Sequence, residues 1–285
     1  MSMKKAFIHI GLPHAASTHL EYFFLDPGAI DVFAPTNLSL QQRTGRDFRL
    51  SYLENPRPGV MTPELQRSRE EYILPLLAND DVKAIIFSEE HFTDPLKYKE
   101  MVPLLGQYLE GFDVKVIFVV RRQDSWLESF YSQQVKDGGT ITFSLWLEQL
   151  NLDDYHWLDY ADAYAEEYNT RVVPLGDSGN DIAVDVFASI GVGIQFESQF
   201  LINPSLPMHY TEALRAANVT LKRPEDRKKL ADVMVEGLIH TTDHKSSNDY
   251  FTTPWCDTSR EEIVKFYQEK NDMLLKKYLP TDVMR

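Results

Sequence analysis

Short apolar runs alternate with amphipathic stretches along this chain. The run from Val114 to Val120 is almost continuously apolar, with Lys115 as its one polar residue. Such a run is typical of a strand that is buried on both faces of a parallel sheet. Three further runs have strand character, with helical periodicity between and after them; they are 5–10, 82–88 and 170–174. The pattern predicts an α/β fold with a parallel central sheet flanked by helices.

The first run stops at Gly11, and a loop of small and hydroxyl residues leads into an amphipathic segment that carries Leu20, Phe23 and Phe24. This pattern predicts a strand, a tight turn and a helix N-terminus. Backbone N–H groups and the positive end of the helix dipole converge at such a junction, so it suits a phosphate or sulfate group. An ordinary turn between a strand and a helix is the alternative interpretation.

The loop departs from the P-loop signature of nucleotide kinases and ATPases, G-x-x-x-x-G-K-[ST]. Gly11 and Thr18 have the required separation, but Ala16 and Ser17 stand where the signature has glycine and lysine. A kinase of this type would lack the lysine that reaches the outer phosphates. The absence of a clear Mg²⁺-binding aspartate after a strand also counts against this class.

Two arginines, Arg121 and Arg122, close the predicted strand 114–120, and a helical pattern begins near Asp124. Ser129 lies eight residues after Arg121, which puts it about a turn and a half into that helix. An arginine at the carboxyl end of a parallel strand and a hydroxyl on the next helix can bind one phosphate together, because ligands bind at that end of the sheet. Surface salt bridges are the ordinary alternative for an arginine pair.

Together the two segments resemble the sulfotransferase family that uses PAPS (3′-phosphoadenosine 5′-phosphosulfate), most of all its bacterial carbohydrate-type members. In that family a loop of the form G-x-P-K-[TS]-G-[TS]-[TS]-x-x-L holds the 5′-phosphosulfate, and an arginine with a serine eight residues later holds the 3′-phosphate. The resemblance implies a P-loop nucleotide-hydrolase-like architecture, with PAPS as donor and PAP as product. It assigns the 3′-phosphate to Arg121 and Ser129, with Tyr131 nearby. It assigns the phosphosulfate to Gly11, Pro13, His14, Ala15, Ala16, Ser17 and Thr18.

Three positions of the first loop depart from the family pattern. His14 replaces the lysine, Ala15 replaces the next hydroxyl, and Ala16 replaces the glycine. The lysine is expected to stabilise the negative charge that develops on the leaving oxygen. A histidine does so only when protonated; its reference pKa is about 6.5, and a neighbouring phosphosulfate favours the charged form. The departures therefore put turnover in question more than nucleotide binding.

A catalytic base is expected after the second predicted strand. Sulfuryl transfer to a hydroxyl is faster when a side chain accepts the hydroxyl proton. The strand 82–88 leads into Glu89, Glu90 and His91, at the edge of a parallel sheet where catalytic groups gather. The family uses a glutamate or a histidine as base, so each of the three is a candidate, and Glu21 is a lesser one. Capping or solvation by a Ser-Glu-Glu turn is the alternative.

Later residues offer further candidates. Lys245 is a candidate for the 3′-phosphate, because members of the resembled family bring a late basic loop onto that group. His240 and His244 have the i, i+4 spacing of metal ligands on a helix, but the residues around them look like a loop, so no metal is expected. Aromatic residues are dense between 138 and 165, where they line a sugar pocket or, as we favour, pack in the core.

The chain of 285 residues is expected to form a single sulfotransferase-like domain, 1–285. The polar stretches 36–68 and 203–255 are candidates for a lid or an acceptor-side insertion. A plain surface connection is the alternative for the first, and the second is irregular except for a helix near 223–238. The resemblance also implies a closing helix at 260–279.

The composition of the chain mainly argues against certain classes of protein. No apolar run reaches the ~18 residues of a membrane span, and no signal peptide is visible. Cys256 is the single cysteine, which fits a reducing compartment, so a cytoplasmic location is expected. A net charge of −14 argues against nucleic acid as a partner.

The sequence therefore predicts an enzyme that moves a sulfuryl group from PAPS to a hydroxyl of a sugar or small-molecule acceptor. The alternative is a non-catalytic protein that binds PAP or another ligand on the same fold. The substitutions Ala15 and Ala16, together with the lost lysine, favour that alternative.

Overall fold

The computed structural model describes residues 3–11, 20, 38–40, 59–80, 82, 84–88, 90–176, 182–191, 206–240 and 257–279. At 38–40, 88, 90–91, 238–240 and 257–258 it describes the backbone alone. The chain divides into two compact units, each built from separate stretches of sequence. Unit 1 comprises 1–121, 156–199 and 269–285, and unit 2 comprises 122–155 and 200–268. Whether these units make up the expected single domain stays a prediction.

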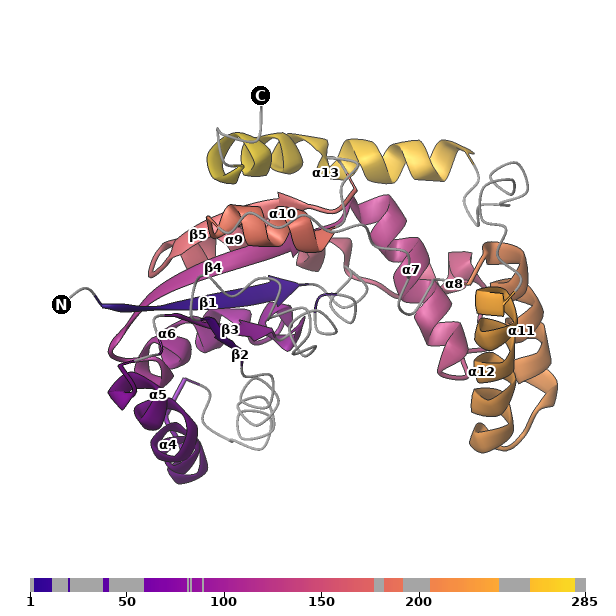
Figure 1. Cartoon of the computed structure of the whole chain (residues 1–285). Coiled ribbons are helices and arrows are strands. Elements are labelled where there is room, and N and C mark those ends of the chain that lie inside the picture. The colour runs from indigo at the N-terminus through magenta and orange to yellow at the C-terminus, as the bar shows by residue number, and fades with distance from the viewer. Residues whose placement is uncertain are drawn as a thin grey trace. The chain divides into compact units, whose positions relative to one another are not determined.

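Unit 1 contains a five-stranded sheet in which every described strand pairing is parallel (Figure 1). The strands are β1 (Lys4–Gly11), β2 (Leu38–Leu40), β3 (Ala84–Ser88), β4 (Phe112–Val120) and β5 (Asn169–Pro174). Their order is β2-β3-β1-β4-β5, so β1 lies in the centre between β3 and β4. The predicted α/β class is confirmed, and the four predicted strands are present within two residues of their expected bounds. The prediction missed β2, whose three residues lie inside the polar stretch 36–68.

Aromatic and aliphatic side chains join the helices of unit 1 to the sheet. The helical segments are α4 (Pro63–Ser68), the π-helical turn η1 (Arg69–Ile73), α5 (Leu74–Ala78), the 3₁₀ turn η2 (Glu90–Thr93), α6 (Tyr98–Tyr108), α9 (Trp157–Ala165) and α10 (Ile182–Ser189). Tyr98 of α6 stacks on Tyr160 of α9 with ring centroids 4.4 Å apart, and Tyr160 lies 6.2 Å from Phe118 of β4. Trp157, Tyr160 and Tyr164 are at most 1% exposed. The core interpretation of these three aromatic residues is therefore confirmed.

Unit 2 is helical in its described part. Its segments are α7 (Gln123–Lys136), α8 (Phe143–Leu147), η3 (Leu152–Tyr155), α11 (Met208–Thr220) and α12 (Pro224–His240). Helix α13 (Asp257–Tyr278) begins in unit 2 and ends in unit 1. The predicted helices after Asp124, near 223–238 and at 260–279 are confirmed. The prediction that the rest of 203–255 is irregular is wrong for 208–220, which forms α11.

Two of the three buried residues of α11 are polar, which explains why the pattern of apolar residues did not predict this helix. Thr211 and Asn218 of α11 are fully buried, although neither is apolar. Thr211 shares a hydrogen bond of 3.2 Å with Ser132 of α7, and Asn218 Nδ2 donates to the carbonyl of Val135 at 2.8 Å. Buried polar side chains are tolerated when they are hydrogen-bonded in this way, so α11 packs with Leu214 as its one buried apolar residue rather than with an apolar stripe.

Side chains also hold the loop between α7 and α8. Four consecutive carbonyls of this loop each lie within hydrogen-bond distance of one side chain. The pairs are Gly138 with Arg227 Nη1 (3.1 Å), Gly139 with Asn218 Nδ2 (3.1 Å), Thr140 with Arg215 Nη1 (3.2 Å) and Ile141 with Tyr131 Oη (3.1 Å). These bonds satisfy backbone groups that a loop cannot satisfy itself.

Candidate functional site

The carboxyl ends of β1 and β4 lie side by side, because these two parallel strands are neighbours in the sheet. The chain leaves β1 for β2 on one side of the sheet and leaves β4 for β5 on the other, so the strand order reverses its direction between β1 and β4 (Figure 1). In open parallel sheets, ligands bind in the crevice that forms at such a switch point, outside the carboxyl ends of the strands. The topology thus gives this sheet edge a ligand-binding geometry independently of any motif.

The register places Gly11 and Arg121 at that switch point. Gly11 is the last residue of β1 and is the Cα partner of Val119 in β4. Arg121 follows Val119 by two residues, which corresponds to about 7 Å along an extended chain. The chain therefore leaves β1 and β4 at neighbouring positions in unit 1.

A tryptophan fixes the backbone at Arg121. The indole Nε1 of Trp157, the first residue of α9, donates to the carbonyl of Arg121 at 2.8 Å. Trp157 is 1% exposed, so the bond lies against the core of unit 1. Arg121 itself is half-buried at the edge of the sheet. The point from which its side chain extends is thus defined by the packing of α9.

The neighbouring arginine has a different partner. Arg122 Nε and Nη2 donate to the two carboxylate oxygens of Asp124 at 2.6 and 2.9 Å, and Arg260 Nε from α13 donates to the same carboxylate at 2.8 Å. Burial alone would raise the pKa of Asp124, but the hydrogen bonds from the two arginines outweigh burial and lower it. The salt-bridge interpretation of the arginine pair is therefore correct for Arg122, within unit 2.

Ser129 and Tyr131 lie on α7, in unit 2, whereas Arg121 is the last residue of this segment of unit 1. Ser129 is 9% exposed and Tyr131 is 1% exposed. The Tyr131 hydroxyl donates to Glu212 Oε1 of α11 at 2.7 Å, and burial together with Glu212 raises its pKa. Tyr131 thus joins two helices of unit 2. The joint action of Arg121 and Ser129 on one phosphate stays a prediction.

The turn after β3 adjoins the same end of β1 from its other side. His9 of β1 is the Cα partner of Ser88, the last residue of β3. The 3₁₀ turn η2 follows, and Thr93 Oγ1 donates to the carbonyl of Gly11 at 3.0 Å. The backbone of Glu90 and His91 lies in this turn, while Glu89 lies outside the described residues. The end of β1 therefore has the turn with the candidate bases on one side and Arg121 on the other.

Most predicted loop residues lie outside the described residues. Gly11 is described and ends β1. Apart from Glu89, the predicted site residues that lie outside the described part are Pro13, His14, Ala15, Ala16, Ser17, Thr18, the lesser base candidate Glu21, His244 and Lys245. Their assigned roles stay predictions.

His9 is a buried polar residue that the sequence analysis did not single out. It lies on the central strand with none of its surface exposed, and burial lowers its pKa to about 3. It is therefore neutral at physiological pH, two residues before the end of β1. A histidine inside an apolar strand is the sequence signal that could have identified it.

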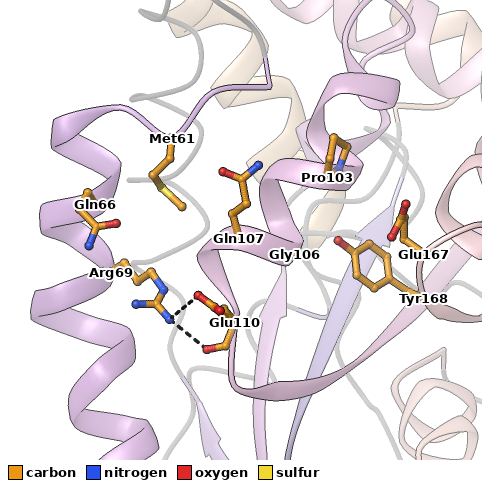
Figure 2. Close-up of a pocket in the computed structure, with 9 residues that line it drawn as sticks. All are labelled: Met61, Gln66, Arg69, Pro103, Gly106, Gln107, Glu110, Glu167 and Tyr168. Carbon is orange, nitrogen blue, oxygen red and sulfur yellow. Dashed lines mark hydrogen bonds and ion pairs between the residues drawn. The ribbon is translucent and has the colours of Figure 1, made fainter.

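A surface pocket of about 620 Å³ lies near the amino-terminal ends of β4 and β5 (Figure 2). Its lining residues are Met61, Gln66, Arg69, Pro103, Gly106, Gln107, Glu110, Glu167 and Tyr168. Glu110 lies two residues before β4, and Tyr168 directly precedes β5. The pocket therefore belongs to the amino edge, away from the carboxyl ends where ligands of parallel sheets bind.

The side chains of this pocket do not suit a phosphate. Arg69 Nε and Nη2 donate to the carbonyls of Tyr108 and Glu110, both at 3.0 Å, and its guanidinium lies 3.8 Å from the Glu110 carboxylate (Figure 2). Tyr168 donates to the carbonyl of Val102, and burial raises its pKa to about 12. With Glu110 and Glu167 in the lining, the pocket offers carboxylates beside an arginine that already has partners.

The described part of the chain contains neither a candidate membrane span nor a candidate metal cluster. None of its helices combines the length and apolar character needed to cross a membrane. Within the same residues, no three histidine, cysteine, aspartate or glutamate side chains gather as metal ligands would.

Comparisons with known proteins leave the family open. No family model matches the chain. An uncharacterized protein of Archaeoglobus fulgidus is 27% identical over 183 residues, which cover 59% of this chain and 46% of that protein. The chain thus spans about half the length of this curated relative. A chain from the PezAT chromosomal toxin–antitoxin system of Streptococcus pneumoniae matches 97% of this chain and 89% of its own length, with 10% identity and a TM-score of 0.29.

Proposed function

We propose that this protein is a sulfotransferase that uses PAPS and acts on a hydroxyl of a sugar or small molecule, without a metal, in the cytoplasm. The observation that carries the proposal is the position of two sequence segments at one switch point. Gly11 and Val119 are register partners, so the glycine loop and Arg121 start side by side at the carboxyl edge of the sheet. Segments 110 residues apart in the chain thereby become the two walls of one proposed nucleotide site.

In this proposal the chain's residues bind and align the reactants. Arg121 and Ser129 bind the 3′-phosphate, and the residues from Gly11 to Thr18 bind the 5′-phosphosulfate through backbone N–H groups and hydroxyls. Lys245 is a further candidate for the 3′-phosphate. PAPS supplies the sulfuryl group. Much of the rate then comes from holding the acceptor oxygen, the sulfur and the leaving oxygen in line.

Two charge movements need side chains. A base from Glu89, Glu90 or His91 takes the proton of the acceptor hydroxyl as its oxygen bonds to sulfur. Protonated His14 stabilises the charge on the phosphate oxygen that leaves with PAP. The turn after β3 lies beside Gly11 at the end of β1, because Thr93 Oγ1 donates to the Gly11 carbonyl, which supports this division of roles.

A non-catalytic PAP-binding protein is the second candidate. The loop has alanine at two positions where the resembled family has a hydroxyl and a glycine, and it lacks the lysine. These losses fall on groups that act on the departing oxygen, whereas the arginine for the 3′-phosphate is retained. Such a protein would bind PAP without transferring sulfate.

Calorimetry with PAP tests the nucleotide site. We expect the wild-type protein to bind PAP and Arg121→Ala to weaken binding by about 2–5 kcal/mol, because an anion loses its charged partner. Arg69→Ala is the matched control, since it removes the same charge from the opposite edge of the sheet in the same unit. Equal effects of both variants would indicate only general electrostatics, and unchanged affinity in Arg121→Ala would remove Arg121 from the site. Binding of ATP with Mg²⁺ but not of PAP would defeat the proposal.

His14→Lys separates the two candidate functions. Lysine stays protonated at alkaline pH, so this variant should transfer sulfate from PAPS faster than the wild-type protein, with a smaller loss of rate above neutral pH. Transfer is measured with labelled PAPS and a panel of hydroxyl acceptors. A decrease in activity would show that His14 does not take the place of the lysine. PAP binding without transfer in the wild-type protein would favour the binding protein.

A further inference from the structure

Two long-range hydrogen bonds hold the turn that follows β3. Thr93 Oγ1 donates to the carbonyl of Gly11 at 3.0 Å, across 82 positions in the sequence. The carbonyl of the preceding residue, Phe92, accepts from Tyr164 Oη of α9 at 2.7 Å, across 72 positions. The turn is therefore bonded on one side to the end of the central strand and on the other to a helix of the core.

Burial makes both bonds difficult to replace. Thr93 is 2% exposed, Phe92 is 1% exposed, and Tyr164 is fully buried. A buried carbonyl that loses its donor destabilises the fold, because water cannot easily take the donor's place. The bonds therefore restrict where the backbone of the turn can lie relative to Gly11.

The Thr93 hydroxyl donates to a backbone carbonyl that is far away in the sequence. Serine and threonine in turns and at helix ends commonly bond to backbone groups a few residues away. Thr93 Oγ1 bonds to the carbonyl of Gly11, the last residue of β1, 82 positions away in the sequence. The bond thus joins the turn after β3 to the end of β1. These two segments are far apart in the sequence and become neighbours only because β3 lies beside β1 in the sheet.

We propose that Thr93 is a positioning residue: its hydroxyl joins the turn after β3 to the start of the loop after β1. Tyr164 is the second anchor of the same turn. If the proposed function holds, on which this role in catalysis rests, the turn carries a candidate base in Glu90 or His91 and the loop binds the donor. The Thr93–Gly11 bond then sets the position of the acceptor side of the reaction against the donor side.

Hydrogen–deuterium exchange tests the anchoring without reference to any ligand. Thr93→Val keeps the size and shape of the side chain and removes only the hydroxyl, while Thr93→Ser keeps the hydroxyl. We expect amide exchange in peptides covering 5–12 and 88–97 to rise at least tenfold in Thr93→Val and to stay near the wild-type rate in Thr93→Ser. Tyr164→Phe should raise exchange in the second peptide and less in the first.

Thr211→Val is the matched control for this measurement. Thr211 is also fully buried, and its hydroxyl donates to the backbone carbonyl of Leu206 at 3.3 Å, but it lies in unit 2. It should raise exchange in both peptides less than Thr93→Val does, because it lowers overall stability without removing a bond to either peptide. If Thr93→Val changes these peptides no more than Thr211→Val does, the anchoring proposal is overturned.

Kinetics extend the test if the wild-type protein transfers sulfate. Misplacement of a reacting group by about 1 Å can cost up to a hundredfold in rate, so we expect kcat to fall tenfold or more in Thr93→Val while the Kd for PAP changes less than threefold. Thr93→Ser should recover most of kcat, and Thr211→Val should keep it. Equal kcat in Thr93→Val and Thr211→Val contradicts a positioning role. If the wild-type protein binds no PAP, the proposed function fails, and the exchange result alone decides the anchoring.

Discussion

Each unit buries an ionisable side chain, His9 in unit 1 and Asp124 in unit 2, and the first is neutral whereas the second is charged. His9 lies inside the sheet of unit 1, where burial lowers its pKa to about 3 and keeps it neutral. Asp124 lies at the start of α7 in unit 2, where burial alone would raise its pKa, but the hydrogen bonds from Arg122 and Arg260 lower it. The sheet thus accommodates a titratable group by removing its charge, whereas the helical unit retains the charge by pairing it.

The largest expected effect is the acid sensitivity that His9 gives to unit 1. The unfolded chain binds a proton at this histidine below a pKa of about 6.5, while the folded chain binds none until about pH 3. Stability is therefore lost as the pH falls from 6.5 toward 3. Between pH 7 and pH 4 the loss from this group is roughly 3 kcal/mol. Urea denaturation of wild-type and His9→Leu proteins at several pH values measures it.

The His9→Leu variant should lose less stability than the wild-type protein over this range, because it has no proton to bind. His209→Leu is the control, since His209 is exposed on α11 of unit 2. Parallel pH curves for the wild-type and His9→Leu proteins would mean that His9 is not held neutral. The difference in charge between the buried groups of the two units would then be wrong for His9.

The second expected effect is the loss of the paired carboxylate in unit 2. Asp124→Asn leaves Arg122 and Arg260 without the negative charge that they share. Breaking a buried pair costs 3–5 kcal/mol when the remaining charge stays buried. Here the two arginine side chains are 62% and 36% exposed, so water can solvate them, and we expect a loss of about 2 kcal/mol at pH 7. Urea denaturation at pH 7 measures it.

The pH window of this effect differs from that of His9. The folded-state pKa of Asp124 is lowered, so its contribution is complete above the unfolded value of about 3.9 and is lost as the pH falls below it. Asp226→Asn is the control, because Asp226 pairs with Arg223 at 2.7 Å at the protein surface, where ion pairs contribute little. Similar losses in both variants would show that burial of Asp124 has no special weight.

The two units also differ in how much of their structure could be predicted from the sequence. The strands of unit 1 are apolar runs: β4 begins and ends within two residues of its expected bounds, and the helix after Arg122 begins within one residue of its expected start. Helix α11 was missed because two of its three buried residues, Thr211 and Asn218, are hydrogen-bonded polar groups on either side of Leu214. A pattern of apolar residues detects burial by the hydrophobic effect and not burial by hydrogen bonding.

The candidate site was predictable only in part for a different reason. Gly11 and Arg121 each stand at the end of an apolar run, and such ends are visible in a sequence. The bond from Thr93 to Gly11 and the bond from Trp157 to Arg121 depend on which strands and helices become neighbours. Strand order is a property of the whole sheet, so no local pattern around Thr93 or Trp157 could indicate these partners.

The smallest expected effect compares one buried phenol in each unit. Tyr131 of unit 2 donates to the carboxylate of Glu212, whereas Tyr168 of unit 1 donates to the neutral carbonyl of Val102. Hydrogen bonds to charged groups contribute about 1.5–3 kcal/mol and those to neutral groups about 1 kcal/mol. Urea denaturation should therefore show a larger loss for Tyr131→Phe than for Tyr168→Phe. Adding Glu212→Gln to Tyr131→Phe should cost less than the two single losses combined, because both changes remove one interaction. Fully additive losses would instead mean that Tyr131 contributes through its contact with the Ile141 carbonyl, 3.1 Å away, and not through the charge of Glu212.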